Sequence, residues 1–479
     1  MLLRNGYVLQ TDETKVFFER LDIRTEDGEI LDLGTDLSQI QDEEIVDLNG
    51  DIVLPGMVNS HYHSYTNILR GTSFGEPLEL WSNDTVALGE ILNKRDMELS
   101  ASLGIIEMLR AGVTACVDHI PHLDKAASIA RVYSSTGFKA GLAPMLHNIK
   151  DSDLLYSMDR EIQKTKSPSP FPSTDEYLHF YRDFIASFNR PNENTRVMVG
   201  INSPQRADDE LLEASSQLAR DFDLPVHSHL LESRWQRLTA DHTHSPVEKM
   251  DQYGLLTKRA SLAHCVWLKD FELELLAQKG ATAITNPTSN HFLGSGVFPA
   301  KVFIERGIPI ALGSDGVNCG TNHNMLEILR FFLLLERNSN PDYGNWIGLK
   351  KGYDIITRNG SSLLNFSKPA GQISKNHAAD LVVVDRTQLL DILDSSLAAQ
   401  LIFNTSHLDV KHVLINGQFV MKDREILGLS ETEIRGEISE RKRALEEPMK
   451  RALERASRDK EPFQRMYGRL QDKFNEYKD

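Results

Sequence analysis

Two histidines one residue apart, His61 and His63, follow an apolar run in the segment NSHYHSYTN at 59–67. On a β-strand, side chains two positions apart point to the same side. The two imidazoles are therefore expected to converge, and converging neutral imidazoles suit a metal ion. A pair with this spacing is more often part of ordinary hydrogen-bonded packing, so further ligands must come from elsewhere in the chain.

Other ionisable side chains stand at the ends of other apolar runs. His227, His229 and Glu232 lie in PVHSHLLE, His264 closes SLAH, and Asp315 follows IALGS. Each has a plain structural explanation when taken alone: His227 as a packing residue, His264 as a core histidine, Asp315 as a helix cap. Their common place at the ends of apolar runs favours one shared site.

The elements that must position these residues follow a regular alternation. Helix candidates such as 97–111, 207–221 and 270–279 separate the apolar runs. The expected strands are the one ending at His61–His63 and then 113–120, 138–146, 196–204, 224–232, 260–268, 281–290 and 308–316. Eight such β-α units predict a TIM barrel. Active sites in that fold lie at the C-terminal ends of the strands, where the candidate residues stand.

The two ends of the chain have a different sequence pattern. Residues 1–55 and 366–430 contain short strands with the turn signals EDGE, LNGD and ING, which fit β-hairpins. We expect them to form one small β-sandwich domain beside a catalytic barrel at 56–365. The charged segment 431–479 is predicted to be a helical tail, solvated or packed as an arm. KSPSPFPS at 166–173 is predicted to be a surface loop.

Composition excludes several classes of function. The formal net charge of −16 over 479 residues disfavours nucleic acid as a partner, because phosphate binding requires a basic surface. No apolar run is long enough for a membrane span. The three widely spaced cysteines, Cys116, Cys265 and Cys319, favour the reducing cytoplasm over a disulfide-linked secreted fold.

Taken together, the chain resembles the amidohydrolase superfamily, specifically its metal-dependent deaminase and triazine chlorohydrolase branch. The relatives in that branch are cytosine, guanine and adenosine-type deaminases. The resemblance spans roughly 1–430 and rests on LPGMVNSHYH, MLRAGVTACVD, SHLLES, LAHCVWL, NPTSNHFLGSG, ALGSDG and ADLVVVD. It implies a TIM barrel with a small β-sandwich, as the alternation of elements predicts independently.

The resemblance also implies roles for the candidate residues. His61, His63, His229 and Asp315 match the metal ligands of the family. Glu232 matches its proton-shuttling glutamate, and His264 matches the histidine that polarises the nucleophile or the bond under attack. The fourth expected strand has no lysine that could bridge a second metal. One divalent ion per chain is therefore expected, zinc first and iron as the alternative.

The expected reaction is attack of activated water on an electron-poor carbon. Asp315 and Glu232 would relay the proton, and Glu232 favours hydrolytic deamination because that route needs protonation of a ring nitrogen. Hydrolysis of an amide, urea or carbamate and dechlorination of a triazine-like compound are alternatives. A non-catalytic metal-binding barrel is a distant one. We expect a small-molecule substrate and a homo-oligomer, a dimer or larger.

Substrate contacts are expected from Trp81, Asn202 and Gln205. Adenosine-type relatives have histidine and tyrosine at the positions of Asn202 and Gln205. The difference favours a compact, unglycosylated heterocycle and poor activity on adenosine or S-adenosylhomocysteine. Five more histidines near strand ends could line the pocket, although a packing role is the more common one: His119, His122, His147, His291 and His323.

Overall fold

Two β-sheets organise the chain in the computed structural model. It describes residues 1–151, 153–154, 171–190, 193–242, 244–390, 396–405 and 408–476. The predicted loop 166–173 lies mostly outside these residues. Within them, no helix combines the length and the apolar character that a membrane crossing requires.

One sheet is the predicted barrel. Its strands run in the order β6 to β14, all neighbours are parallel, and a parallel bridge from Tyr62 to Asp315 links the last strand end to the first. The strands are β6 (Met57–Tyr62), β7 (Val113–Ile120), β8 (Lys139–Leu146), β10 (Val199–Ile201), β11 (Val226–Leu230), β12 (Ala260–His264), β13 (Thr282–Thr285) and β14 (Ile310–Leu312). A short strand, β9 (Thr195–Val197), also pairs with β8. The TIM-barrel prediction is confirmed.

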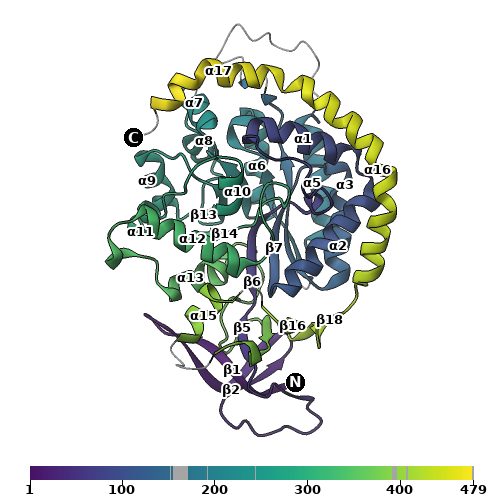
Figure 1. The fold of residues 1–479 in the computed structure, drawn as a ribbon, viewed down its shortest axis with the longest axis vertical. Helices are drawn as coiled ribbons and strands as arrows, with labels where there is room; N and C mark the ends of the chain where they lie inside the picture. Colours follow the sequence, from purple (N-terminus) through teal and green to yellow (C-terminus); the bar gives the residue numbers. More distant parts are fainter. Residues whose placement is uncertain are drawn as a thin grey trace.

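Helices surround this barrel (Figure 1). The predicted helices at 97–111, 207–221 and 270–279 correspond to α2, α6 and α9. The helices are α1 (Leu78–Ile91), α2 (Lys94–Arg110), α3 (Leu123–Thr136), α5 (Thr174–Phe188), α6 (Asp209–Asp221), α7 (Arg234–His242), α8 (Pro246–Gln252), α9 (Asp270–Lys279), α10 (Pro287–Phe292), α11 (Ala300–Glu305), α12 (Met325–Ser339), α13 (Leu349–Ile356), α14 (Arg358–Ser361) and α15 (Leu397–Phe403). Because they cover the outer face, every residue of β7 and β8 is buried.

The other sheet joins both chain ends, as predicted. Its strands are β1 (Leu2–Thr11), β2 (Val16–Glu26), β3 (Glu29–Gly34), β4 (Ile45–Asp47), β5 (Ile52–Pro55), β15 (Leu381–Val384), β16 (Val410–Ile415), β17 (Gln418–Lys422) and β18 (Glu425–Ile426). The domain boundaries 1–55, 56–365 and 366–430 stay a prediction. Two further helices, α16 (Glu431–Asp459) and α17 (Glu461–Glu476), follow within the segment predicted as a helical tail.

Two of the three predicted hairpins are confirmed. Asn416 and Gly417 join β16 to β17, and both have the positive φ that a two-residue hairpin turn requires. Asp27 and Gly28 do the same between β2 and β3. The LNGD prediction is wrong, since β4 and β5 both pair in parallel with β1. The turn therefore does not reverse the chain. Instead, β4 and β5 lie one after the other along β1.

Several strands of the barrel are shorter than predicted, and β13 shows a physical reason. The predicted strand 281–290 ends at Thr285, and Pro287 begins α10 at the first helical position. Proline favours that position because its ring fixes a helical φ and its missing N–H has no helical partner there. The polar residues Ser289 and Asn290 therefore stand on a helix at the strand end, where both contact the candidate site.

Candidate metal centre

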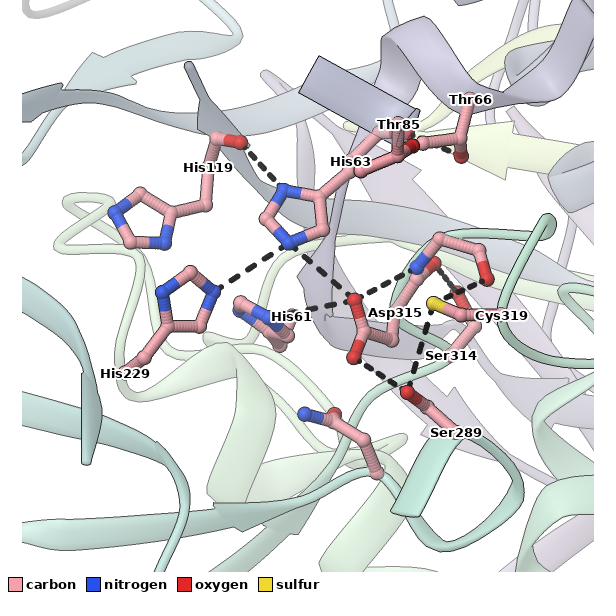
Figure 2. Close-up of polar contacts among 12 residues, drawn as sticks. His61, His63, Thr66, Thr85, His119, His229, Ser289, Ser314, Asp315 and Cys319 are labelled. Carbon is pink, nitrogen blue, oxygen red and sulfur yellow. Dashed lines mark hydrogen bonds and ion pairs between the residues drawn. The ribbon is translucent and has the colours of Figure 1, made fainter. Parts of the chain in front are cut away.

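Four predicted ligands lie together at the C-terminal end of the barrel (Figure 2). His63 Nε2 is 3.4 Å from His229 Nε2 and 3.3 Å from Asp315 Oδ1, and His61 Nε2 is 3.8 Å from the same oxygen. They come from the first, fifth and eighth barrel strands and the loops that follow. The closed barrel therefore brings together residues from distant parts of the chain.

Backbone carbonyls fix the ring tautomer of two of these histidines. His63 Nδ1 lies 2.6 Å from the carbonyl oxygen of His119, and His229 Nδ1 lies 2.7 Å from that of Asn202. A carbonyl oxygen can only accept a hydrogen bond, so each Nδ1 carries the hydrogen. In the neutral ring, Nε2 then has its lone pair free, and it points into the cluster.

A longer chain of hydrogen bonds fixes His61. Ser261 Oγ donates to the carbonyl oxygen of Val226, which leaves it to accept a hydrogen bond from His227 Nδ1 at 2.8 Å. His227 Nε2 is therefore the acceptor for His61 Nδ1, also at 2.8 Å. In the neutral ring, His61 Nε2 is then left unprotonated. His227, next to the ligands, therefore has a clear positioning role.

The donor set fits a divalent metal ion. Burial lowers the pKa of His61 and of His229 well below the usual value, so both rings are neutral, as metal ligation requires. His61 Nε2 is buried and has no hydrogen-bond partner among the described residues. Ligand atoms about 2.0–2.1 Å from one tetrahedral zinc ion lie roughly 3.4 Å apart, close to the spacings found here.

Asp315 is held in a conformation that few residues adopt. Its φ is +61°, in the left-handed region, and its backbone N–H donates to the carbonyl oxygen of His61 at 3.0 Å. Ser289 Oγ donates to Oδ2 at 2.8 Å, and the N–H of Gly316 donates to Oδ1 at 2.7 Å. The carboxylate is fixed toward the imidazoles at the cost of backbone strain, a combination typical of functional sites.

Glu232 and His264 form a second pair beside the ligands. His264 Nε2 lies 3.3 Å from Glu232 Oε2 and 3.7 Å from Asp315 Oδ2. His264 Nδ1 lies 2.9 Å from Asn290 Oδ1 on α10, which fixes the ring. Burial raises the pKa of Glu232 well above its usual value, and the nearby Asp315 and Glu79 raise it further. A carboxyl and an imidazole at this distance can share and transfer a proton.

A cavity of about 120 Å³ opens onto this cluster. Trp81 and Asn202, from which substrate contacts are expected, line it together with Glu232, His264 and Asp315. Gln205 is not among the lining residues, and its role stays a prediction. The cavity volume is well below the roughly 300–1,000 Å³ of pockets for drug-sized ligands. The space suits a compact ligand.

Three charged residues of the cavity wall were not predicted: Glu79, Asp151 and Arg206. Arg206 Nη1 donates to Asn202 Oδ1 at 3.1 Å, and its Nε lies 3.1 Å from Asp151 Oδ1. Glu79 stands in the first turn of α1, where an acidic residue has an ordinary explanation as a partner of the helix dipole. The sequence therefore gives no sign that Glu79 is buried, because its burial results from the packing of other elements around α1.

Of the additional histidines, His119 comes nearest to the ligands. Its ring centroid is 4.6 Å from that of His229, and both of its buried ring nitrogens have no hydrogen-bond partner in the described part of the chain. His323 is bound on both ring nitrogens, by Ser314 and Asn67. None of the five lines the cavity: His119, His122, His147, His291 and His323.

Known proteins match both the sequence and the fold. The model of the Amidohydrolase family matches residues 52–420. A 5-methylthioadenosine/S-adenosylhomocysteine deaminase of Acetivibrio thermocellus is 28% identical over 448 residues, 92% of this chain and 98% of the relative. A 5'-deoxyadenosine deaminase of Methanothermobacter thermautotrophicus is 28% identical over 409 residues, 85% of this chain and 90% of its own. The structure of an adenosine deaminase from Xanthomonas campestris with bound zinc has a TM-score of 0.80 at 22% identity, covering 93% of this chain and 98% of that one.

Proposed function

The chain belongs to the amidohydrolase family, and we propose that it hydrolytically deaminates a small, unglycosylated N-heterocycle. One observation carries the proposal. The Glu232–His264 pair lines the same small cavity as His63, His229 and Asp315 of the ligand cluster. A proton carrier beside a metal-type donor set is what addition of water to a ring carbon requires.

We propose that His61, His63, His229 and Asp315 hold one divalent ion, zinc first and iron as the alternative. Such an ion supplies an activated water by lowering its pKa toward about 7. Nitrogen and carboxylate donors suit zinc, and residues 196–204 include no lysine for a second metal. The zinc in the related adenosine deaminase structure is consistent with this choice.

The protein side chains would move the proton. Asp315 would accept a proton from the attacking water and return it to the departing amine, and Glu232 would deliver a proton to the ring nitrogen next to the attacked carbon. His264 Nδ1 donates to Asn290, so the ring would hold the attacking oxygen and the developing negative charge by hydrogen bonding when Nε2 carries a proton as well. Trp81 provides a flat apolar wall, and the Asn202 amide offers a donor and an acceptor to a neutral ring.

The leaving group and the substrate class follow from the relatives and from the size of the cavity. Both relatives carry the name of a deaminase, which favours an amine as the leaving group. Their named substrates are nucleosides, whereas the cavity of about 120 Å³ favours a compound without a sugar. Hydrolysis of an amide, urea or carbamate and triazine dechlorination are the alternative reactions of the same residues.

A release assay tests the reaction. Metal-loaded enzyme is incubated with aminopurines, pterins, aminopyrimidines, ureas and chlorotriazines, and both ammonia and chloride are measured. We expect ammonia from at least one unglycosylated amine. Glu232→Gln should keep its metal and its fold but lose roughly 10²-fold or more in kcat. Chloride release without ammonia, or full activity of Glu232→Gln, would contradict the proposal.

Elemental analysis tests the metal assignment separately. We expect about one divalent ion per chain in the wild type and loss of that ion in His61→Ala. His179→Ala is a matched control, because its imidazole is exposed on α5 and is far from the cluster in sequence. Two tightly bound ions per chain would refute the mononuclear site, and full metal content in His61→Ala would remove His61 from the ligand set.

A further inference from the structure

The C-terminal helix α17 lies at the end of the barrel that faces away from the small sheet (Figure 1). It packs there on an element of the cavity wall. Phe463 and Met466 form an apolar cluster with Trp235 and Leu238 of α7, and the indole N–H of Trp235 donates to Met466 Sδ. Trp235 also lines the cavity. The helix therefore contacts the back of a residue of the cavity wall.

The helix is also attached to α1, another part of the cavity wall. Lys460, at the junction of α16 and α17, is 6% exposed, and its Nζ lies 2.7 Å from both Glu76 Oε2 and Asp84 Oδ2. Asp84 belongs to α1 and Glu76 precedes it, and α1 carries Glu79 and Trp81. A buried ammonium with two carboxylates is a firm anchor. The last helix thus links α1 to α7.

Between these anchors runs a chain of hydrogen bonds to the candidate proton carrier. The Tyr467 hydroxyl donates to Glu79 Oε2, and the Ser233 hydroxyl donates to Glu79 Oε1. Glu79 is 6% exposed and lines the cavity. A buried carboxyl group requires such donors, because burial without a hydrogen-bond partner is unfavourable. Tyr467 and Ser233 share this task.

Ser233 is next to Glu232 in a turn that these contacts fix. The N–H of Glu232 donates to Gln236 Oε1 at 2.7 Å, and the N–H of Gln236 donates to Ser233 Oγ at 3.2 Å. Leu231 enters the turn with a φ of +46°, in the left-handed region. A strained turn keeps its shape only while its surroundings hold it. The Glu79 carboxylate is one of those surroundings.

We propose that α17 is a structural part of the active site and that Tyr467 is a positioning residue. It holds Glu79 and, through Ser233, the turn that places Glu232. The catalytic consequence rests on the proposed function, but the coupling between Tyr467 and the turn does not. The tail predicted as solvated or as a packing arm would then be required for the geometry of the site.

Hydrogen exchange of the metal-loaded, full-length protein tests the coupling without any substrate. Tyr467→Phe removes one hydroxyl and keeps the ring. We expect faster exchange of the amides of residues 232–236, with metal content and exchange in β1–β3 unchanged. Arg465→Gln, on the same helix and with its side chain 66% exposed, is the matched control and should exchange like the wild type. Unchanged exchange at 232–236 in Tyr467→Phe would overturn the proposal.

Turnover provides the second readout once a substrate is known. We expect kcat to fall roughly tenfold or more in Tyr467→Phe and in Ser233→Ala, as for loss of a hydrogen bond to a buried charge. The double variant should lose much less than the product of the two, because both act through Glu79. If the double variant instead loses the product of the two single losses in kcat, Tyr467 and Ser233 do not act through Glu79 together. Faster exchange without any detectable reaction would refute the proposed function while supporting the role of Tyr467.

Discussion

At the scale of single residues, hydrogen bonds on the far side of each ring determine what the histidines can do. His63 and His229 donate to backbone carbonyls, and His61 donates to another imidazole. A carbonyl is part of the fold and cannot change its role, whereas His227 is a side chain that can be replaced. The orientation of His61 is therefore the one that a single substitution can disturb.

The first prediction concerns His227. In His227→Ala, His61 Nδ1 loses its acceptor and the ring loses its fixed orientation, so metal affinity should fall about 10–100-fold. Competition with a chromophoric chelator measures this change. His291→Ala is the control, because this residue is exposed and its Nδ1 donates to the carbonyl oxygen of Pro287 rather than to a predicted ligand. If His227→Ala binds metal as tightly as the wild type, the contact between His61 and His227 contributes only to packing.

The second prediction concerns Asn202 and the ranking of substrates. The wild type should process unglycosylated amines better than adenosine or S-adenosylhomocysteine. Asn202→His removes the acceptor of Arg206 and should change discrimination between substrates by about 1–3 kcal/mol, with little change in stability. Ratios of kcat/KM measure it. Efficient turnover of adenosine by the wild type would refute the substrate class and leave the metal chemistry intact.

At the scale of elements, the long helix α16 is fixed to the barrel helices by charge as well as by apolar contact. Ile434 packs against Leu99 and Ile106 of α2. Arg441 donates through Nε and Nη2 to both oxygens of Asp96, at 2.7 and 2.8 Å. Asp96 is fully buried and also closes the capping box of α2 with Asn93. One carboxylate thus stabilises a helix end and holds the neighbouring helix.

The third prediction follows from that carboxylate. Arg441→Leu leaves Asp96 without its guanidinium partner and should lower the free energy of unfolding by about 1.5–3 kcal/mol. Denaturant titration of the metal-loaded protein measures the loss. Arg443→Leu, an exposed position two residues away, should change stability by no more than about 0.5 kcal/mol. Equal effects of the two substitutions would mean that the ion pair adds nothing.

At the scale of the whole molecule, a buried ion pair joins the barrel to the small sheet. Lys139 Nζ at the start of β8 lies 2.8 and 2.6 Å from the two oxygens of Asp380, and both side chains are 4% exposed. The N–H of Asn416, in a hairpin turn of the small sheet, also donates to Asp380 Oδ1. The junction depends on residues from three distant parts of the sequence.

The fourth prediction tests this junction. Asp380→Asn keeps the shape but leaves the Lys139 ammonium buried and unpaired, so the free energy of unfolding should fall by about 3–5 kcal/mol. Glu446→Gln, in an exposed pair with Lys450, should cost at most about 1 kcal/mol. Urea titration compares the two variants. A cost for Asp380→Asn as small as that of the control would show that water reaches the lysine.

Local rules of sequence were enough to predict the barrel and the residues of its rim. Buried parallel strands are continuous apolar runs, and residues at their C-terminal ends must share one rim. The order of residues along the chain therefore assigns six side chains to that rim: His61, His63, His229, Glu232, His264 and Asp315. The domain boundaries follow from the change of pattern along the chain and the chemical roles from resemblance, and both stay predictions where nothing yet tests them.

The tautomers of the imidazoles, the burial of Glu79 and the place of α17 depend instead on tertiary contacts. Each of them needs partners far away in the chain: Asn202 for His229, Tyr467 for Glu79, and α7 for the last helix. Such contacts leave no periodic pattern, since an acidic residue in a first helical turn looks the same whether it is solvated or covered. Such contacts can be identified only in the folded structure, where distant segments of the chain lie side by side.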